Sequence, residues 1–180
     1  MRRWIGRIEA RVTRWHSFLA RNPRVVICGR SNVGKSTLAR LATDRLVYNT
    51  GVIGIDGDTP TEIDFKATPY WWLDRLEKTY GPWLLEGTQG SRIVRAGLRD
   101  LLWEPDGVAH VLGVYDPRDL PPDERSGDEA EDYRRASVLA SRAAWQESVW
   151  RDYLMVRAER WARSELMALT LDGWLAEVER

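Results

Sequence analysis

The stretch from Arg24 to Ala42 constrains the fold of this chain more than any other segment. Residues 24–28 form an apolar, β-branched run that stops at a glycine, as a short buried strand does. Residues 29–36, GRSNVGKS, fit the pattern G-x-x-x-x-G-K-[ST] of a phosphate-binding loop. Apolar residues at helical spacing follow from Thr37 to Leu46, so the motif lies between a strand and a helix, as this pattern requires.

Each residue type in this glycine loop has a physical role in holding a triphosphate. Gly29 and Gly34 let the backbone turn so that its N–H groups approach phosphate oxygens. Lys35 supplies a mobile positive charge for the β- and γ-phosphates, and the Ser36 hydroxyl is a ligand for Mg²⁺. We therefore predict that the loop binds ATP with Mg²⁺, although no residue outside it distinguishes ATP from GTP. The residues of this predicted site are Gly29, Arg30, Ser31, Asn32, Val33, Gly34, Lys35, Ser36 and Thr37.

Length and composition narrow the class of protein. A chain of 180 residues fits one well-buried α/β domain, and its formal net charge of zero predicts no polyanion partner. The single cysteine, Cys28, excludes an internal disulfide and a cysteine-based zinc site. The sequence has no signal-peptide pattern and no apolar run of about 18 residues. We therefore expect a cytoplasmic protein that makes no membrane-spanning contact.

Residues 1–22 have the pattern of a basic amphipathic helix. Apolar residues recur at spacings of three and four with arginines between them, and Asn22-Pro23 ends the pattern. Three interpretations are open: a helix packed on the flank of the domain, a surface facing nucleic acid, or a helix lying on a membrane surface.

Two further segments read as strands that end in acidic residues. Residues 52–55 precede Asp56 and Asp58, and residues 83–85 precede Glu86. The carboxyl ends of parallel strands meet at one edge of a sheet, so these carboxylates are expected to face the glycine loop. Asp58 or Asp56 can then orient an acceptor hydroxyl and take its proton, unless the pair serves only the turn. The candidate metal-site residues are Ser36, Asp56 and Glu86.

Helices are predicted over Asp64–Lys78 and Thr88–Leu102. The Trp71-Trp72 pair on the first either packs in the core or stacks on a base. Arg92 and Arg95 lie near the start of the second helix, where a guanidinium can clamp a phosphate.

The last third of the chain begins with a fourth strand over residues 108–115. The acidic, proline-rich segment 116–130 is predicted to be a lid-like loop. A long helix over 131–163 and an apolar stretch over Leu166–Val178, with a final helix after Asp172-Gly173, make up the C-terminal helices predicted over 131–180 of the single domain. The long helix offers a surface for a homodimer. Candidates for an arginine finger on the long helix are Arg134, Arg135 and Arg142.

The glycine loop resembles that of small translation-associated GTPases, but the D-x-x-G and N-K-x-D elements of those proteins do not occur in this sequence. The remaining motifs resemble the nucleotide-kinase group of P-loop NTPases. More narrowly, residues 81–87 followed by Arg92 to Arg99 are similar to small phage P-loop kinases, a group that includes kinases proposed to phosphorylate 5-hydroxymethyluracil in DNA. The similarity extends over roughly residues 24–116, and the acceptor-site signatures of adenylate, thymidylate and shikimate kinases are missing.

This resemblance implies a three-layer αβα P-loop NTPase fold with a mainly parallel sheet, here with an extra N-terminal helix and a long C-terminal helix. It implies an ATP- and Mg²⁺-dependent kinase whose acceptor is a hydroxyl of a nucleotide or of a hydroxymethylated pyrimidine in DNA. A small-metabolite or antibiotic kinase and a P-loop ATPase or GTPase regulatory module are the alternatives. The predicted catalytic residues are Lys35, Asp58, Asp56, Glu86, Arg92 and Arg95.

Overall fold

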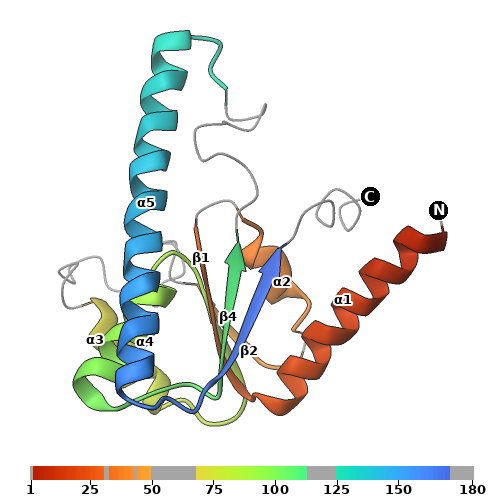
Figure 1. The fold of residues 1–180 in the computed structure, drawn as a ribbon, viewed down its shortest axis with the longest axis vertical. Coiled ribbons are helices and arrows are strands. Elements are labelled where there is room, and N and C mark those ends of the chain that lie inside the picture. Colours follow the sequence, from red (N-terminus) through yellow and green to blue (C-terminus); the bar gives the residue numbers. More distant parts are fainter. Residues whose placement is uncertain (1, 31–32, 43, 50–67, 113–124, 171–180) are drawn as a thin grey trace.

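A computed structural model describes residues 2–30, 33–42, 44–49, 68–112 and 125–170 (Figure 1). Along these residues the helices and strands are α1 (Arg2–Arg21), β1 (Arg24–Gly29), α2 (Lys35–Arg40), β2 (Leu46–Asn49), α3 (Thr68–Glu77), β3 (Trp83–Glu86), α4 (Gly90–Ala96), the π-helical turn η1 (Gly97–Leu101), β4 (Gly107–Leu112), α5 (Glu129–Glu159) and β5 (Glu165–Thr170).

The strands form one five-stranded parallel sheet in the order β2-β3-β1-β4-β5. The central strand β1 pairs with β3 on one side and with β4 on the other. This register places Ile27 opposite Glu86 and Cys28 opposite His110. Helices flank the sheet (Figure 1), so the predicted α/β fold with a parallel sheet is confirmed, in an arrangement compatible with three layers.

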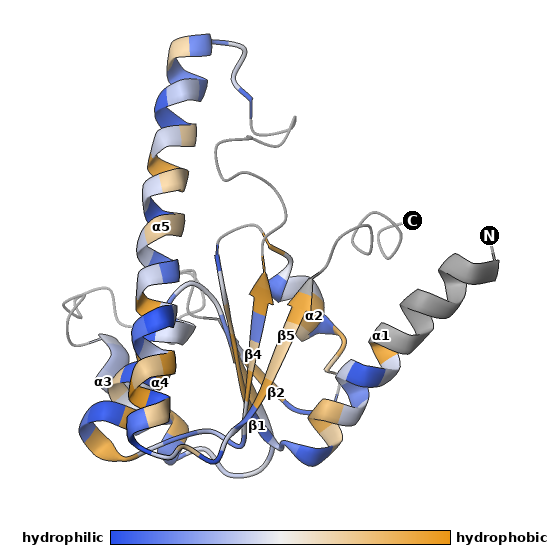
Figure 2. Cartoon of the chain, viewed as in Figure 1, coloured by the Kyte–Doolittle hydropathy of each residue, from blue (hydrophilic) through white to orange (hydrophobic). Residues whose placement is uncertain are grey.

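The side chains of β1 alternate between two hydrophobic cores. Val25 and Ile27 pack against α1 and α2, whereas Val26 and Cys28 pack against α3, α4 and α5. All four side chains are completely buried. A strand that is buried on both faces reads as a continuous apolar run, which is why the sequence identified it. Figure 2 shows the hydrophobic strands between the helices of the two faces.

The C-terminal half of α1 packs on the flank of the sheet. Trp15, Phe18 and Leu19 are buried there, and the rings of Trp15 and Phe18 stack with their centroids 5.8 Å apart. The Asn22 side chain donates a 2.8 Å hydrogen bond to the carbonyl of Phe18 at the end of the helix. For the part from Val12 onward, these contacts confirm the flank-packing interpretation.

The helix after the glycine loop is shorter than predicted. It ends at Arg40, and the prediction that it reaches Leu46 is wrong because Leu46 begins β2 opposite Trp83. The apolar spacing continued past the helix because Ala42 still faces the core that holds Leu38. The strand predicted over residues 52–55 lies outside the described residues.

The prediction of C-terminal helices over 131–180 is wrong for residues 165–170, because these residues form β5 beside β4. Leu166 is 40% exposed, whereas Met167 and Leu169 are buried, so the side chains alternate as in a strand at the edge of a sheet. Pairing with β4 orders this apolar segment as a strand. The final helix predicted after Asp172-Gly173 lies outside the described residues.

The long helix α5 begins after Asp128, whose carboxylate accepts a 2.9 Å hydrogen bond from the backbone N–H of Ala130. Its C-terminal half packs on the sheet, whereas its N-terminal half extends past the sheet edge toward which the strands point (Figure 1). Val149 and Tyr153 are therefore buried, whereas Val138 and Trp145, nearer the N-terminus of the helix, are 50% and 40% exposed.

The two middle helices follow the predictions in outline. On α3, Trp72 is buried in the core and meets the ring of Trp71 edge-on at 4.9 Å, so core packing is confirmed for Trp72. The helix predicted over 88–102 is divided into α4 and η1. Gly90 at the start of α4 permits a close approach to β1, because a Cβ there would lie 2.8 Å from the carbonyl oxygen of Ile27.

Candidate active site

The glycine loop follows β1 at the carboxyl edge of the sheet, and both of its motif glycines have backbones that favour glycine. Gly29 has φ of +140°, and a Cβ at this position would lie 2.5 Å from the carbonyl oxygen of Val111 on β4. Gly34 has φ of 82° and immediately precedes α2. Side chains at either position would strain the turn that brings Lys35 to the first position of the helix.

Lys35 is almost completely buried, at 6% exposure. Its amino group donates a hydrogen bond to the backbone carbonyl of Arg30, at the other end of the described loop. Burial lowers the pKa of Lys35, while the nearby Glu86 and Cys28 act in the opposite direction. The loop therefore holds the positive charge of Lys35 in a poorly solvated position, where an anion would stabilise it.

Ser36 and Glu86 connect the glycine loop to the neighbouring strand. The Ser36 hydroxyl donates a 2.9 Å hydrogen bond to Glu86 Oε1 at the end of β3. Burial raises the pKa of Glu86, and the hydrogen bond from Ser36 and the charge of Lys35 partly oppose this. Because β3 pairs directly with β1, the sheet register itself brings this carboxylate to the loop.

The loop and Glu86 lie where the chain changes sides of the sheet. The helix that follows β1, α2, packs in one core, whereas α4, which follows β3, packs in the other. In open parallel α/β sheets, ligands bind outside the carboxyl ends of adjacent strands whose connections run to opposite faces. The site that the sequence predicted therefore has the topology of a ligand-binding edge.

The two predicted arginines of α4 have different surroundings. Arg92 is buried in the first turn, where its Nη1 donates a 2.9 Å hydrogen bond to Gln89 Oε1. Arg95 lies one turn further along, and its Nη1 forms a 2.9 Å ion pair with Asp152 of α5. Arg92 thus remains close to the loop that follows Glu86, whereas Arg95 joins two helices.

The other predicted site residues fall into two groups. Arg30 forms a 3.8 Å ion pair with Glu147 of α5, and Val33 and Thr37 are half-buried beside the loop. The predictions for Ser31, Asn32, Asp56 and Asp58 lie outside the described residues.

The long-helix arginines that were candidates for an arginine finger lie on the first turns of α5. Arg134 donates to the carbonyl of Ala130 on its own helix, and Arg135 lies 3.8 Å from Glu131. Within the described residues both contacts are local to the helix.

The sequence did not identify His110, which is buried near the end of β4. Its ring stacks on Trp150 of α5, with centroids 4.0 Å apart and planes 12° from parallel. Burial lowers the pKa of His110 to about 4, and the charges of Arg30 and Lys35 add to the effect. A histidine inside an otherwise apolar strand was the available signal, but the stacking partner lies on a distant helix.

Cys28, which lies opposite His110 in the sheet register, is completely buried. Burial raises the pKa of its thiol to about 12, while a hydrogen bond with Ser91 and the charge of Lys35 act against the shift. A thiol with so high a pKa is protonated at neutral pH and a poor nucleophile.

Of the predicted metal-site residues, Ser36 and Glu86 lie in the described part of the chain and contact each other. Among the described residues, no group of three or more histidine, cysteine, aspartate or glutamate side chains could hold a metal ion. A hydroxyl and a carboxylate 2.9 Å apart nevertheless fit a hard cation that keeps several water or phosphate ligands. The third predicted metal residue, Asp56, lies outside the described residues.

No family model matches the chain, and comparisons with curated proteins and with solved structures also gave no match. In the described part of the chain, none of the helices is both long and apolar enough to span a membrane.

Proposed function

We propose that this protein is a P-loop kinase that uses ATP and Mg²⁺ to phosphorylate a hydroxyl group. The observation that carries the proposal is the meeting of Lys35, Ser36 and Glu86 at the carboxyl edge of the sheet, with the Ser36–Glu86 hydrogen bond of 2.9 Å. A buried lysine charge and a hydroxyl beside a buried carboxylate are the groups that a Mg²⁺–triphosphate needs.

Different residues of the site would bind the phosphates and the Mg²⁺ ion. Backbone N–H groups of the glycine loop and the Lys35 amino group would hold the β- and γ-phosphates, releasing Lys35 from the Arg30 carbonyl. Ser36 and Glu86 would hold Mg²⁺, directly or through water, and the ion would neutralise charge on the phosphates. The raised pKa of Glu86 favours a site that gains a cation on binding, because a nearby positive charge stabilises the carboxylate.

The reaction would be an in-line displacement at the γ-phosphorus. The acceptor oxygen forms a bond to phosphorus, the bond to the β-phosphate oxygen breaks, and ADP leaves with that electron pair. Asp58 or Asp56 would take the acceptor proton, as the sequence predicts. Arg92, Arg95 or an arginine of the long helix would neutralise the moving phosphoryl group, and Arg92 is favoured because Arg95 pairs with Asp152.

The proposed acceptor is a nucleotide or a hydroxymethylated pyrimidine, such as 5-hydroxymethyluracil, in DNA. The test supplies γ-labelled ATP and Mg²⁺ with a panel of nucleosides, nucleoside monophosphates, plain DNA, hydroxymethyluracil DNA and hydroxylated metabolites. Label on a nucleotide or on modified DNA would support the proposal. Label on a metabolite would instead indicate a small-molecule kinase. Label released only as free phosphate would indicate an ATPase or a regulatory module.

Lys35→Ala is the decisive variant in this assay. We expect it to lower turnover by at least about 100-fold with the fold retained, because it removes the charge that faces the phosphates. Lys78→Ala is the matched control, since Lys78 is exposed on the surface and pairs only locally with Asp74 among the described residues. Near-full activity in Lys35→Ala would show that the glycine loop is not the donor site.

A further inference from the structure

A cluster of mostly polar side chains lies between α4 and α5. The other buried residues with which these two helices pack on the sheet are mainly apolar. We call Gln89, Arg92, Trp145 and Gln146 the α4–α5 cluster. Gln89 and Arg92 are each 8% exposed and Gln146 is 7% exposed, whereas Trp145 is 40% exposed. The cluster therefore combines three buried hydrogen-bonding groups with one aromatic ring that reaches the surface.

Contacts of the neighbouring residues give the direction of Gln146. Trp145 lies beneath the Arg92 guanidinium, whose central carbon is 5.8 Å from the ring centroid, so it faces α4. Glu147 lies 3.8 Å from Arg30, so it faces the glycine loop. Consecutive residues of an α-helix are rotated by about 100°, and Gln146 therefore points between α4 and the loop, toward the strand ends.

Gln146 has an unused hydrogen-bonding atom in this position. Its Oε1 is buried and has no hydrogen-bond partner among the described residues. A buried acceptor without a partner is costly, and such atoms in native proteins usually bind a ligand or an ordered water. An incoming group must then bring an N–H or O–H donor to this atom.

We propose that the α4–α5 cluster is the subsite for the base of the acceptor, and that the acceptor is a nucleoside or nucleotide. A ring N–H or amino group of the base would donate to Gln146 Oε1, and the ring would stack on the exposed part of Trp145. The Arg92 guanidinium, held by Gln89, fixes the Trp145 ring from its other side. This inference rests on the proposed kinase function, because the adjacent glycine loop would bring the γ-phosphate to the same edge.

Equilibrium dialysis tests the subsite without requiring turnover. The ligands are labelled adenosine, guanosine, cytidine, thymidine and 5-hydroxymethyldeoxyuridine, with labelled ribose as the ligand that lacks a base. Each is dialysed against the full chain, alone and with Mg²⁺ and a non-hydrolysable ATP analogue. The variant Gln146→Met replaces the amide by an apolar side chain of similar shape, and Ser148→Ala changes an exposed position two residues along α5.

We expect the full chain to bind at least one nucleoside in preference to ribose. Gln146→Met is expected to weaken that binding by about 5- to 150-fold, the range that follows from losing one hydrogen bond to a buried group. Affinity for the ATP analogue is expected to change less than about twofold, and Ser148→Ala to bind like the wild type. Without ligand, Gln146→Met is expected to melt at a higher temperature, because it removes an unpaired buried acceptor.

Equal nucleoside binding by Gln146→Met and the wild type, equal binding of ribose and nucleosides, or no nucleoside binding at all would overturn the inference. A lower melting temperature of Gln146→Met with unchanged nucleoside binding would mean that Gln146 Oε1 accepts a hydrogen bond from another group of the protein. If the ATP analogue does not bind while Gln146→Met still loses nucleoside affinity, the kinase proposal fails and the base subsite stands. Trp145→Leu offers a second variant at an exposed position, expected to weaken binding of every base.

Discussion

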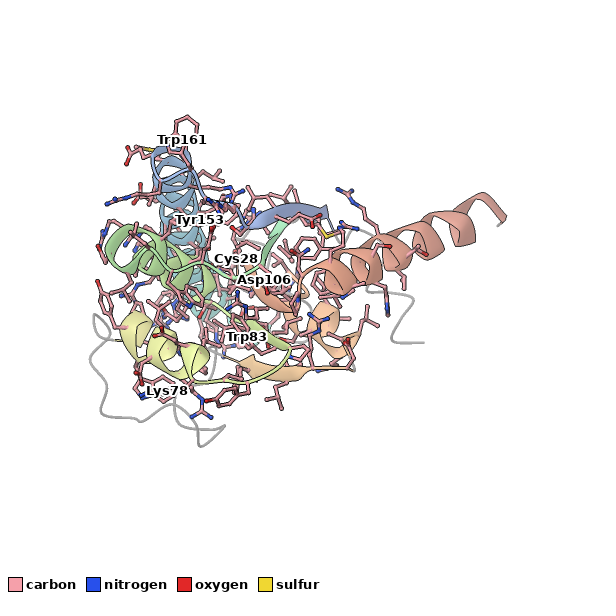
Figure 3. The ribbon with its side chains drawn as sticks, turned by 90° about the horizontal axis from the view of Figure 1, so that it is seen from below. Cys28, Lys78, Trp83, Asp106, Tyr153 and Trp161 are labelled. Atoms are coloured by element: carbon pink, nitrogen blue, oxygen red, sulfur yellow. The ribbon has the colours of Figure 1, made fainter. Side chains whose placement is uncertain are left out.

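The two edges of the sheet use charged side chains in opposite ways. At the amino edge, Arg24 pairs with Asp106, and Glu104 accepts hydrogen bonds of 2.9 to 3.0 Å from the backbone N–H groups of Arg163 and Ser164. Figure 3, which looks at this edge from below, shows Asp106 near the middle of the molecule and Trp161 at its periphery. At the carboxyl edge, Lys35 and Glu86, which lie in the described part of the chain, are buried.

The pKa values express the same contrast. Arg24 lowers the pKa of Asp106 through a hydrogen bond, so this carboxylate is more stable charged in the folded protein than in the unfolded chain. Burial raises the pKa of Glu86 and lowers that of Lys35, so both are less stable charged. Exposed ion-paired charges that support stability lie at one edge, and buried charges that a ligand of opposite charge would stabilise lie at the other. Such shifts are typical of ligand-binding sites.

The largest expected effect that tests this contrast comes from Glu86→Gln. The amide keeps a hydrogen-bond acceptor for Ser36 but removes the charge that would hold Mg²⁺, so turnover is expected to fall by about 100- to 1000-fold. Folding stability is expected to hold or rise at neutral pH. The folded-state pKa of Glu86 is raised, so the wild type loses stability as pH rises from the ordinary pKa of this group to the raised one, and the uncharged glutamine does not. Steady-state kinetics and thermal melting measure the two effects.

Glu104→Gln is the matched control at the amino edge. It weakens charge-assisted hydrogen bonds to two backbone N–H groups, so it is expected to lower the melting temperature and to leave turnover unchanged. If Glu86→Gln destabilised the fold while turnover survived, Glu86 would stabilise the fold as Glu104 does. The charged groups at the two edges would then have the same role.

The second largest expected effect is a pH dependence of the free energy of unfolding, which results from the lowered pKa of His110. Its folded pKa of about 4 lies below the ordinary 6.5, so the unfolded chain binds more protons in this window. Stability therefore increases with pH across the window, and as pH falls from 6.5 to about 4 the wild type loses up to about 3 kcal/mol through this group. His110→Phe keeps an aromatic ring on Trp150 and is expected to remove this part of the slope.

Urea unfolding at several pH values between 4 and 7 measures the difference between His110→Phe and the wild type. His16→Gln, which changes the other histidine at an exposed position of α1, is the matched control. Parallel stability curves for His110→Phe and the wild type would show that His110 is solvated in the folded protein.

Sequence reasoning could find the glycine loop and Glu86 because both depend on local or topological rules. The loop motif has fixed spacing, and Glu86 directly follows an apolar run whose carboxyl end reaches the same edge. It could not find the stacking of His110 on Trp150, because that contact joins β4 to a helix 40 residues later in the chain. Only the packing of α5 on the sheet defines it.

The wrong predictions have a related cause. Leu46 continued the helical spacing that follows the glycine loop, and Leu166 lies in the C-terminal region predicted to be helical, yet both lie in strands. Leu46 pairs with Trp83 and Leu166 pairs with Val108, and this pairing makes both segments strands. The partners lie far along the chain, so the local spacing of apolar residues does not reveal them. The same limit applies to Arg95, whose partner Asp152 lies on α5.

The smallest expected effect is that of Arg24→Ala at the amino edge. The guanidinium forms a 2.8 Å ion pair with Asp106, but the Arg24 side chain is 47% exposed, so solvent screens the pair. The backbone N–H of Arg24 also donates to Asp106 at 2.9 Å, and this bond survives the substitution. We therefore expect a loss of only about 0.2 to 1 kcal/mol, further reduced in high salt, in urea unfolding. Asp106→Ala, which removes both contacts, is expected to cost more. A loss in Arg24→Ala as large as that in Asp106→Ala would mean that the exposed pair itself supports the fold, and the two edges would then differ less than their burial suggests.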